Sequence, residues 1–210
     1  MDSGTILRVD HLCKSFGAQR VIDDLSFVLE PGHVARVVGA NGAGKTTLFR
    51  LLTLLLHPDS GSICFNGHDL CSADLRWIGY LPEERGVYRR EKVEEQAIFF
   101  ARLKGLTADE AKRNVANWME RLGMTDWRSR RASTLSKGMQ QRLQFLIAVA
   151  HTPRLLILDE PFSGFDADNS ALLKQQIGLL SAQGTAVLLS THRYDLAETA
   201  TMCHQTISLQ

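Results

Sequence analysis

Gly39-Ala40-Asn41-Gly42-Ala43-Gly44-Lys45-Thr46 is the stretch that decides the fold, because it matches the phosphate-binding pattern G-x-x-x-x-G-K-[ST]. Its glycines let backbone amides close around phosphate groups that side chains would obstruct. A short apolar run at residues 33–38 precedes the stretch, and residues 44–55 have the pattern of a helix. The sequence therefore predicts a strand, a phosphate-binding loop and a helix whose positive N-terminus faces the bound anion.

The loop ends in two residues that can act directly on a nucleotide. Lys45 would bring a positive charge to the phosphates, and the Thr46 hydroxyl is placed to hold Mg²⁺. The other loop residues that we expect to bind the nucleotide are Gly39, Asn41, Gly42, Ala43, Gly44 and Thr47. This part of the sequence predicts a site for a nucleoside triphosphate together with Mg²⁺.

A second motif, further along the chain, supplies acidic groups. The apolar run Leu155–Leu158 is typical of a strand buried on both faces of a parallel sheet, and Asp159 and Glu160 follow it directly. Since ligands bind at the carboxyl ends of such strands, both acids are expected near the phosphate-binding loop. We expect Asp159 to hold Mg²⁺ and its waters, and Glu160 to accept a proton from an attacking water.

A third motif, LSKGMQQR at residues 135–142, resembles the signature of the ATP-binding cassette (ABC) family. It lies at an expected helix start before the acidic strand, where that family has it. Ser136 alone would also fit an ordinary helix N-cap, but the three motifs in this order are specific. The resemblance runs from Phe16 to His192, nearly the whole chain, and implies an ATP-hydrolysing subunit.

Further residues match positions that have known roles in the ABC family. The resemblance implies that Phe16 stacks on the adenine ring and that His192 contacts the γ-phosphate. Glu83 lies where the family usually has a Gln that touches Mg²⁺ and the attacking water. The expected metal ligands are thus Thr46, Glu83 and Asp159, and the expected catalytic residues are Lys45, Glu160 and His192.

The resemblance also implies that two subunits share each nucleotide. Ser136 and Gly138 of one subunit would close over the γ-phosphate held by the other. Residues 163–166, which end in Asp166, resemble the loop that reaches across to the partner subunit. Binding of ATP would then bring the two subunits together, and hydrolysis would let them part.

Three positions depart from the usual family pattern. Lys137 and Met139 replace Gly and Gln in the signature, and Glu83 replaces Gln. Ser136 and Gly138 are kept, so we interpret these changes as variation within a branch and not as loss of activity. The stretches 81–86 and 135–140 resemble the branch associated with sodium, drug or polymer export.

The charge balance limits the possible partners. The 210 residues include 24 Lys and Arg and 23 Asp and Glu, a net charge of +1, so we expect no nucleic-acid partner. The most apolar stretch, residues 48–56, is too short to span a membrane, and residues 1–4 lack the basic and apolar parts of a secretory signal. We therefore expect a cytoplasmic protein that is peripheral on the inner face of the cell membrane, through the permease that the resemblance implies.

The four cysteines, Cys13, Cys64, Cys71 and Cys203, form no C-x-x-C pair, so we expect reduced thiols. Cys64, His68 and Cys71 lie close together in the sequence, and a metal site there is conceivable. A zinc site needs four ligands, however, so we interpret the three residues as chance neighbours beside a turn.

The remaining pattern predicts an α/β fold: a P-loop NTPase core with a mainly parallel sheet, an N-terminal antiparallel β part and a helical subdomain insert. Strands are expected at 5–9, 25–29, 33–38, 63–65, 78–81, 155–158, 186–190 and 206–209. Helices are expected at 44–55, from 93, from 107 with a capping box, from 136 and around 173–180. We expect a single ABC ATPase domain over 1–210, with a core of 1–85 and 151–210 and an insert at roughly 86–150.

These observations predict an ATPase subunit that dimerises with a second ATPase subunit and powers a separately encoded integral membrane permease, with export favoured by the branch resemblance. The alternative is a soluble or envelope-associated ABC ATPase that does mechanical work without moving a solute. The segment between Lys45 and Ser136 has no sustained heptads, which disfavours the DNA-repair branch with its long coiled coils. Arg128, Arg130 and Arg131 form a tight basic cluster, which we interpret as a solvated face.

Overall fold

Two β-sheets and a group of helices make up the fold in the computed structural model, which describes residues 4–83, 86–163, 166–191 and 201–209. The strands are β1 (Leu7–Phe16), β2 (Gln19–Leu29), β3 (Val34–Val38), β4 (Ser60–Phe65), β5 (His68–Asp69), β6 (Ile78–Leu81), β7 (Leu155–Leu158), β8 (Ala186–Thr191) and β9 (Gln205–Ser208). The α-helices are α1 (Lys45–Leu52), α2 (Val93–Leu103), α3 (Ala108–Arg121), α4 (Lys137–Val149) and α5 (Ala167–Ala182). The 3₁₀ helices are η1 (Ser72–Trp77), η2 (Thr125–Trp127) and η3 (Ala132–Thr134).

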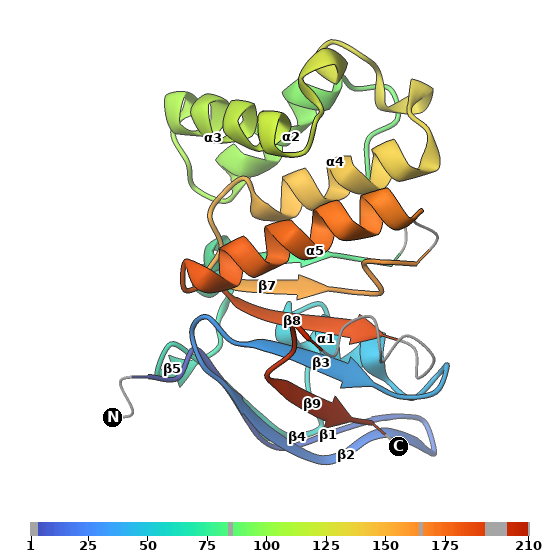
Figure 1. The fold of residues 1–210 in the computed structure, drawn as a ribbon. Coiled ribbons are helices and arrows are strands. Elements are labelled where there is room, and N and C mark those ends of the chain that lie inside the picture. The colour runs from blue at the N-terminus through green and yellow to red at the C-terminus, as the bar shows by residue number, and fades with distance from the viewer. Residues whose placement is uncertain (1–3, 84–85, 164–165, 192–200, 210) are drawn as a thin grey trace.

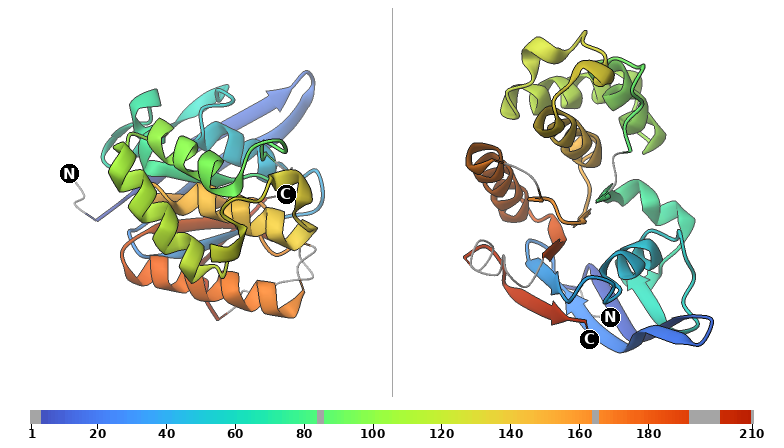
Figure 2. Two further views of the ribbon diagram at one scale, coloured as in Figure 1. Left: turned by 90° about the horizontal axis from the view of Figure 1, so that it is seen from above. Right: turned by 90° about the vertical axis from the view of Figure 1, so that its right-hand side faces the viewer.

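The two sheets differ in strand direction. One has the order β6-β7-β8-β3-β9 with parallel pairing throughout, and the other has the order β2-β1-β4-β5 with antiparallel pairing. Figure 1 shows the parallel strands in the middle of the molecule, with α2, α3 and α4 above and the antiparallel strands below. The side view of Figure 2 separates the helical layer from the strand layers. The predicted α/β fold with a parallel sheet and an N-terminal antiparallel part is confirmed.

The central strands β7 and β8 of the parallel sheet are buried at every position. Every residue of β7 is buried, and alternate residues face opposite sides. Leu156 and Leu158 pack into a core with the helices α2 to α5, whereas Leu155 and Ile157 pack into a second core with α1 and the antiparallel sheet. The continuous apolar run in the sequence therefore indicated a central strand correctly.

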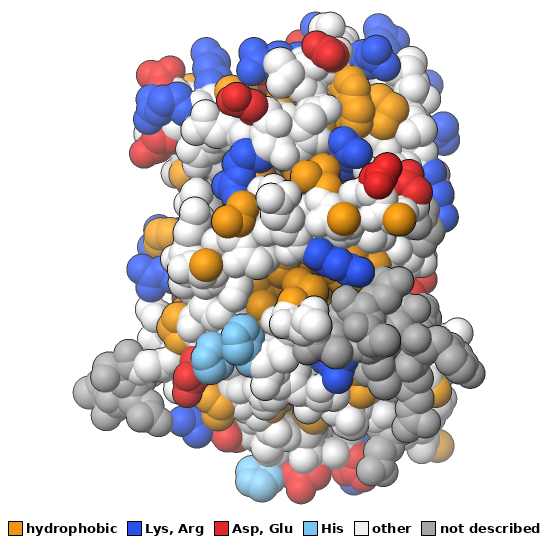
Figure 3. Space-filling view, viewed as in Figure 1, with side chains coloured by type: hydrophobic (Ala, Val, Ile, Leu, Met, Phe, Trp, Pro, Cys, Tyr) orange, Lys and Arg blue, Asp and Glu red, His pale blue; other side chains and the backbone are white. Residues whose placement is uncertain are grey.

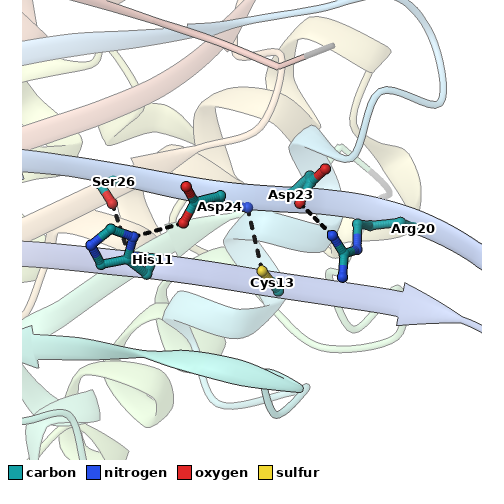
Figure 4. A network of polar contacts seen from close by, with 6 residues as sticks. All are labelled: His11, Cys13, Arg20, Asp23, Asp24 and Ser26. Atoms are coloured by element: carbon teal, nitrogen blue, oxygen red, sulfur yellow. Dashed lines mark hydrogen bonds and ion pairs between the residues drawn. The ribbon is translucent and has the colours of Figure 1, made fainter.

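The first two strands are longer than predicted. They form a hairpin over Leu7–Phe16 and Gln19–Leu29, and its outer face carries the polar residues labelled in Figure 4. The Nδ1 atom of His11 lies 2.7 Å from Oδ1 of Asp24, and both residues have left-handed backbones at shifts in the pairing register. Because bulges and exposed charges break the alternation of apolar residues, the sequence revealed only the strand ends.

Other differences are local. Helix α1 ends at Leu52, short of the predicted residue 55, because Leu54 turns into the left-handed region with φ 58°. The short strand β5 and helix η1 were not predicted. The predicted capping box of α3, Thr107 with Glu110, is confirmed.

The surface carries both signs of charge. Figure 3 shows Lys and Arg side chains interspersed with Asp and Glu on one face, with many of the basic side chains on the helical upper part. In the ranges that the structure describes, none of the helices combines the length and the apolar character that crossing a membrane requires.

Candidate nucleotide-binding site

The strand order brings the predicted motifs to one edge of the parallel sheet. Gly39 follows β3, Asp159 follows β7, and Ser190 and Thr191 end β8. Strand β8 lies between β7 and β3, and all three strands run in the same direction. Their carboxyl ends therefore meet, which is where ligands bind in open parallel sheets.

The phosphate-binding loop is held tightly between β3 and α1. Gly44 caps α1 with φ 96°, a left-handed conformation that disfavours other residues. A Cβ atom at Gly44 would lie 2.9 Å from the carbonyl oxygen of Val21, and one at Gly39 would lie 2.8 Å from Cβ of Ala43. These two glycines are thus required for the loop to pack against the hairpin and against itself.

Lys45 lies inside the loop that it follows. Its side chain is only 6% exposed, and Nζ donates hydrogen bonds to the carbonyl oxygens of Gly39 at 3.0 Å and Ala40 at 3.2 Å. The same nitrogen is 3.9 Å from Oε1 of Glu160. The ammonium group of Lys45, expected to bind phosphate, and the carboxylate of Glu160, expected to accept a proton, are therefore neighbours.

Thr46 and Asp159 also meet, as a shared metal site requires. The Thr46 hydroxyl donates to Oδ2 of Asp159 at 2.9 Å, and Asp159 is 1% exposed. A hydroxyl and a carboxylate are the oxygen ligands that Mg²⁺ prefers. The oxygen ligands that Thr46 and Asp159 offer therefore fit Mg²⁺.

Ser190 connects the two acids, and sequence reasoning missed it. Its hydroxyl donates to Oδ1 of Asp159 at 2.7 Å and accepts from the backbone N–H of Glu160 at 2.7 Å. Asp159 also donates its own backbone N–H to the carbonyl oxygen of Leu81 at 2.8 Å. These bonds hold Asp159 and Glu160 in place at the end of β7. A lone serine at a strand end gives no sequence signal for such a role.

The backbone at Glu160 is strained. Glu160 has φ 50°, which costs a residue with a Cβ atom about 1–2 kcal/mol, and Pro161 follows it. Left-handed non-glycine residues of this kind concentrate at functional sites. Burial and then the charge of Asp159 raise the pKa of Tyr80 to about 12, so Tyr80 stays neutral.

A polar cavity of about 440 Å³ opens over these groups. It is lined by Asn41, Gly42, Gly44, Lys45, Thr46, Thr47, Glu83, Glu160 and Ser163. Glu83 is exposed at its rim and also lines an adjoining cavity of about 330 Å³, together with Lys137 and Asp159. The predicted loop residues and all three predicted metal ligands are thus close together.

The residues expected to act on a partner's nucleotide lie elsewhere. Ser136 and Asp166 are exposed N-caps of α4 and α5, and each accepts a hydrogen bond from its own helix, from Met139 and Asn169 respectively. A Cβ atom at Gly138 would lie 3.2 Å from the Asn169 amide nitrogen, which places the two helix starts side by side. None of the three predicted residues lines the 440 Å³ cavity.

The start of α4 is nevertheless tied to the turn after Glu160. The Gln141 amide donates to the carbonyl oxygen of Ser163 at 2.9 Å. Phe16 is half exposed at the end of β1, with Nζ of Lys14 at 5.8 Å from its ring centre, and it does not line the cavity. His192 lies outside the described residues, so its predicted role is not tested.

A glycine-rich loop between a strand and a helix, with Asp and Glu at the end of a neighbouring parallel strand, defines the P-loop class of nucleotide-binding proteins. Comparison with known proteins narrows the class. The family model for ABC transporters matches residues 22–163. The chain belongs to the ABC transporter family.

Individual relatives agree with this assignment. The uncharacterized ABC transporter ATP-binding protein YhaQ of Bacillus subtilis is 44% identical over 92% of the chain, and the chain spans 65% of its length. The lipopolysaccharide export system ATP-binding protein LptB of Haemophilus influenzae is 30% identical over 96% of the chain and 85% of its own length. A solved ATP-binding subunit of an ABC transporter superposes with a TM-score of 0.90 at 31% identity, over 98% of this chain and 86% of the other.

Proposed function

We propose that the chain binds ATP with Mg²⁺ and hydrolyses it, and that two such subunits power a membrane permease. The observation that carries the catalytic part is the hydrogen-bonded group of Thr46, Asp159, Ser190 and Glu160 beside Lys45. Thr46 and Asp159, with Glu83 at the rim, would hold Mg²⁺, which neutralises charge on the phosphates when bound. The site therefore has separate groups for the metal, the phosphates and the water.

Each side chain has a distinct task in this proposal. Lys45 would exchange its two carbonyl acceptors for phosphate oxygens, which are stronger acceptors because they are charged. Glu160 would accept the proton of the attacking water, since its carboxylate lies beside Lys45 and faces the cavity. Ser190 would hold both acids in place, and His192 and Phe16 would bind the γ-phosphate and the adenine.

The dimer proposal rests on residues that face away from this subunit's own cavity. Ser136, Gly138 and Asp166 lie at the adjoining starts of α4 and α5, and the two polar caps are exposed. An exposed cap hydroxyl next to a helix N-terminus can receive a phosphate group from outside. A second copy, or a related subunit, would complete each site in this way.

We also propose that 86–150 forms a helical insert in a single domain whose core is 1–85 and 151–210.

The permease proposal rests on an aromatic groove on the helical part. A cavity of about 330 Å³ is lined by Tyr88, Glu91, Glu95, Gln96 and Phe99, and Tyr88 and Phe99 are 54% and 50% exposed. Exposed aromatic groups in a groove with a charged rim suit the apolar face of an amphipathic helix.

Four basic side chains extend this surface. Arg89, Arg90, Arg130 and Arg131 are exposed and have no ion-pair partner among the described residues. Backbone hydrogen bonds join their two segments, for example from Val93 to Arg130 and from Ser133 to Arg89. We propose that this surface receives a cytoplasmic helix of the permease, so that the chain works at the inner face of a membrane. Export is favoured by the branch resemblance and by the name of LptB.

The composite site can be tested by mixing two inactive variants, Lys45→Ala and Ser136→Arg. A dimer with one subunit of each kind keeps one intact site, so random mixing should restore about a quarter of the normal hydrolysis. The matched control mixes Lys45→Ala with the double variant, which leaves no intact site and should restore nothing. A mixture no more active than its components contradicts the shared site, as does a Glu160→Gln variant that stays monomeric with ATP on a sizing column.

A further inference from the structure

Three potential metal ligands lie close together at the β5 edge of the antiparallel sheet, outside the cavity of the phosphate-binding loop. His68 belongs to β5, and Cys71 and Asp74 belong to the start of η1. One ligand atom of each residue lies within 4.8 Å of the others, and it is the one such group found in the described part of the chain. In the sequence, Cys64, His68 and Cys71 lie close together. In the structure, Asp74 takes the place of Cys64 in this group.

The exchange of Cys64 for Asp74 follows from the pleat of the hairpin. Cys64 pairs with Asp69 across β4 and β5, whereas His68 pairs with the buried Phe65. Neighbouring residues of a strand face opposite sides, so Cys64 and His68 point apart. The Sγ atom of Cys64 accordingly lies 3.5 Å from Oδ1 of Asp69.

The ligand atoms are already in contact. Nε2 of His68 lies 3.0 Å and 3.1 Å from the two carboxylate oxygens of Asp74, and Sγ of Cys71 lies 3.4 Å from Oδ2. A tetrahedral ion with ligands at 2.0–2.3 Å needs ligand atoms roughly 3.3–3.8 Å apart. Small side-chain movements would therefore bring these atoms to the spacing that a tetrahedral ion needs. A bound metal ion would then take the place of the protons that the atoms share.

One ligand is fixed and the other two are accessible. Asp74 is only 6% exposed, and its Oδ2 also accepts the backbone N–H of Cys71 at 3.0 Å, which orients the carboxylate. His68 and Cys71 are exposed, so an ion can reach them from solvent. The cluster thus combines an oriented anchor with an open side.

We propose that His68, Cys71 and Asp74 bind one divalent transition-metal ion of the zinc and cobalt class, with solvent as the fourth ligand. Imidazole and thiolate favour such ions over Mg²⁺ and Ca²⁺, which prefer oxygen. The ion would fasten the β4–β5 hairpin to η1, which leads directly into β6 of the parallel sheet. Binding would stabilise the joint between the two sheets without touching the nucleotide site.

Titration of the whole, reduced, metal-free chain with Co²⁺ in the absence of nucleotide tests the proposal. We expect one equivalent to bind with a thiolate-to-metal absorption band, and Zn²⁺ to displace it. Cys71→Ser should abolish the band, and His68→Gln should weaken binding about 10-fold or more. Cys64→Ser and Cys13→Ser, which remove thiols outside the cluster, are the matched controls and should keep the band.

Thermal unfolding provides a second measurement. Zn²⁺ should raise the melting temperature of the wild type and of Cys64→Ser but not that of Cys71→Ser, since only a bound ion stabilises the fold. ATP hydrolysis should be unchanged in Cys71→Ser, which separates this proposal from the proposed function. A band that survives Cys71→Ser or that disappears in Cys64→Ser overturns the proposal, and the three residues are then only a hydrogen-bonded helix cap.

Discussion

The two halves of the proposed nucleotide site are built in opposite ways. On one side, Lys45, Asp159 and Ser190 are almost fully buried and hold one another or the loop through hydrogen bonds of 2.7–3.2 Å. On the other side, Ser136 and Asp166 are exposed, and among the described residues their side chains bond within the first turns of their own helices. One half is held in place by the core, and the other is presented to solvent.

This difference indicates which groups must be positioned before the nucleotide binds. Groups that act on a developing charge are effective when their orientation does not change during the reaction. The buried half meets that condition within one subunit. The exposed half can be oriented by contact with a partner, so its cost in stability to the single chain is small. Substitutions should therefore affect stability and hydrolysis together in the buried half, but hydrolysis alone in the exposed half.

The largest expected effect comes from Glu160→Gln. The amide keeps the shape of the side chain but cannot accept a proton, so hydrolysis should fall by about 10²–10⁴-fold while ATP still binds. Turnover is measured by phosphate release and binding by nucleotide fluorescence. Glu120→Gln, an exposed change on α3, should leave both unchanged. Near-normal turnover in Glu160→Gln would show that another group accepts the proton.

The next largest effect is expected for Ser190→Ala. The change removes the hydroxyl that donates to buried Asp159 and accepts from the Glu160 N–H. Two lost bonds, one of them to a carboxylate, should lower the free energy of unfolding by about 2–4 kcal/mol. Misplacement of both acids should reduce hydrolysis by about 10²-fold. Urea unfolding and turnover check the two values, and a change in only one of them would break the coupling that we infer.

Ser136→Ala gives the matched test in the exposed half. The hydroxyl caps α4 through a 3.3 Å bond from Met139, so its loss should cost no more than about 1 kcal/mol of stability. Hydrolysis should fall about tenfold or more if the hydroxyl also bonds a partner's phosphate, because bonds to charged groups are stronger. If stability falls as far as in Ser190→Ala, the two halves do not differ in the proposed way.

The same contrast explains how much the sequence alone could predict. The strand at Leu155–Leu158 was predicted to the residue, because a strand buried on both faces shows an unbroken apolar run. The loop motif was equally clear, since Gly44 is required by its left-handed backbone and its close packing on Val21. Where burial and backbone geometry dictate the residue type, the pattern is visible.

Patterns failed where contacts come from distant parts of the chain. Ser190 acts through two acids about thirty positions away, and nothing in its local sequence shows this. Asp74 joins His68 only because a hairpin and a 3₁₀ helix meet. Residues 10–16 of β1 and 19–24 of β2 were missed for a different reason, since exposed bulged strands lack the alternation that reveals a buried face.

The smallest effect is expected at Glu83, which belongs to neither half. It is exposed, yet it lines both the loop cavity and the cavity that includes Asp159 and Lys137. A carboxylate at this rim adds negative charge beside the metal ligands, which strengthens binding of a divalent cation through a partly screened interaction. Glu83→Gln should therefore raise the half-saturating Mg²⁺ concentration for hydrolysis about threefold, a change of roughly 0.65 kcal/mol, and leave the maximal rate within about twofold.

The measurement for Glu83 is a titration of the hydrolysis rate against Mg²⁺ at saturating ATP, with Glu120→Gln as the control for loss of one exposed negative charge. If the half-saturating Mg²⁺ concentration shifts in Glu83→Gln but not in Glu120→Gln, the effect comes from the closeness of Glu83 to the metal ligands. Glu120 lies on α3 and lines neither cavity. Equal curves for both variants would mean that Glu83 is a solvated loop acid. A large fall in maximal rate would instead place Glu83 with the buried groups, as a residue that orients the water itself.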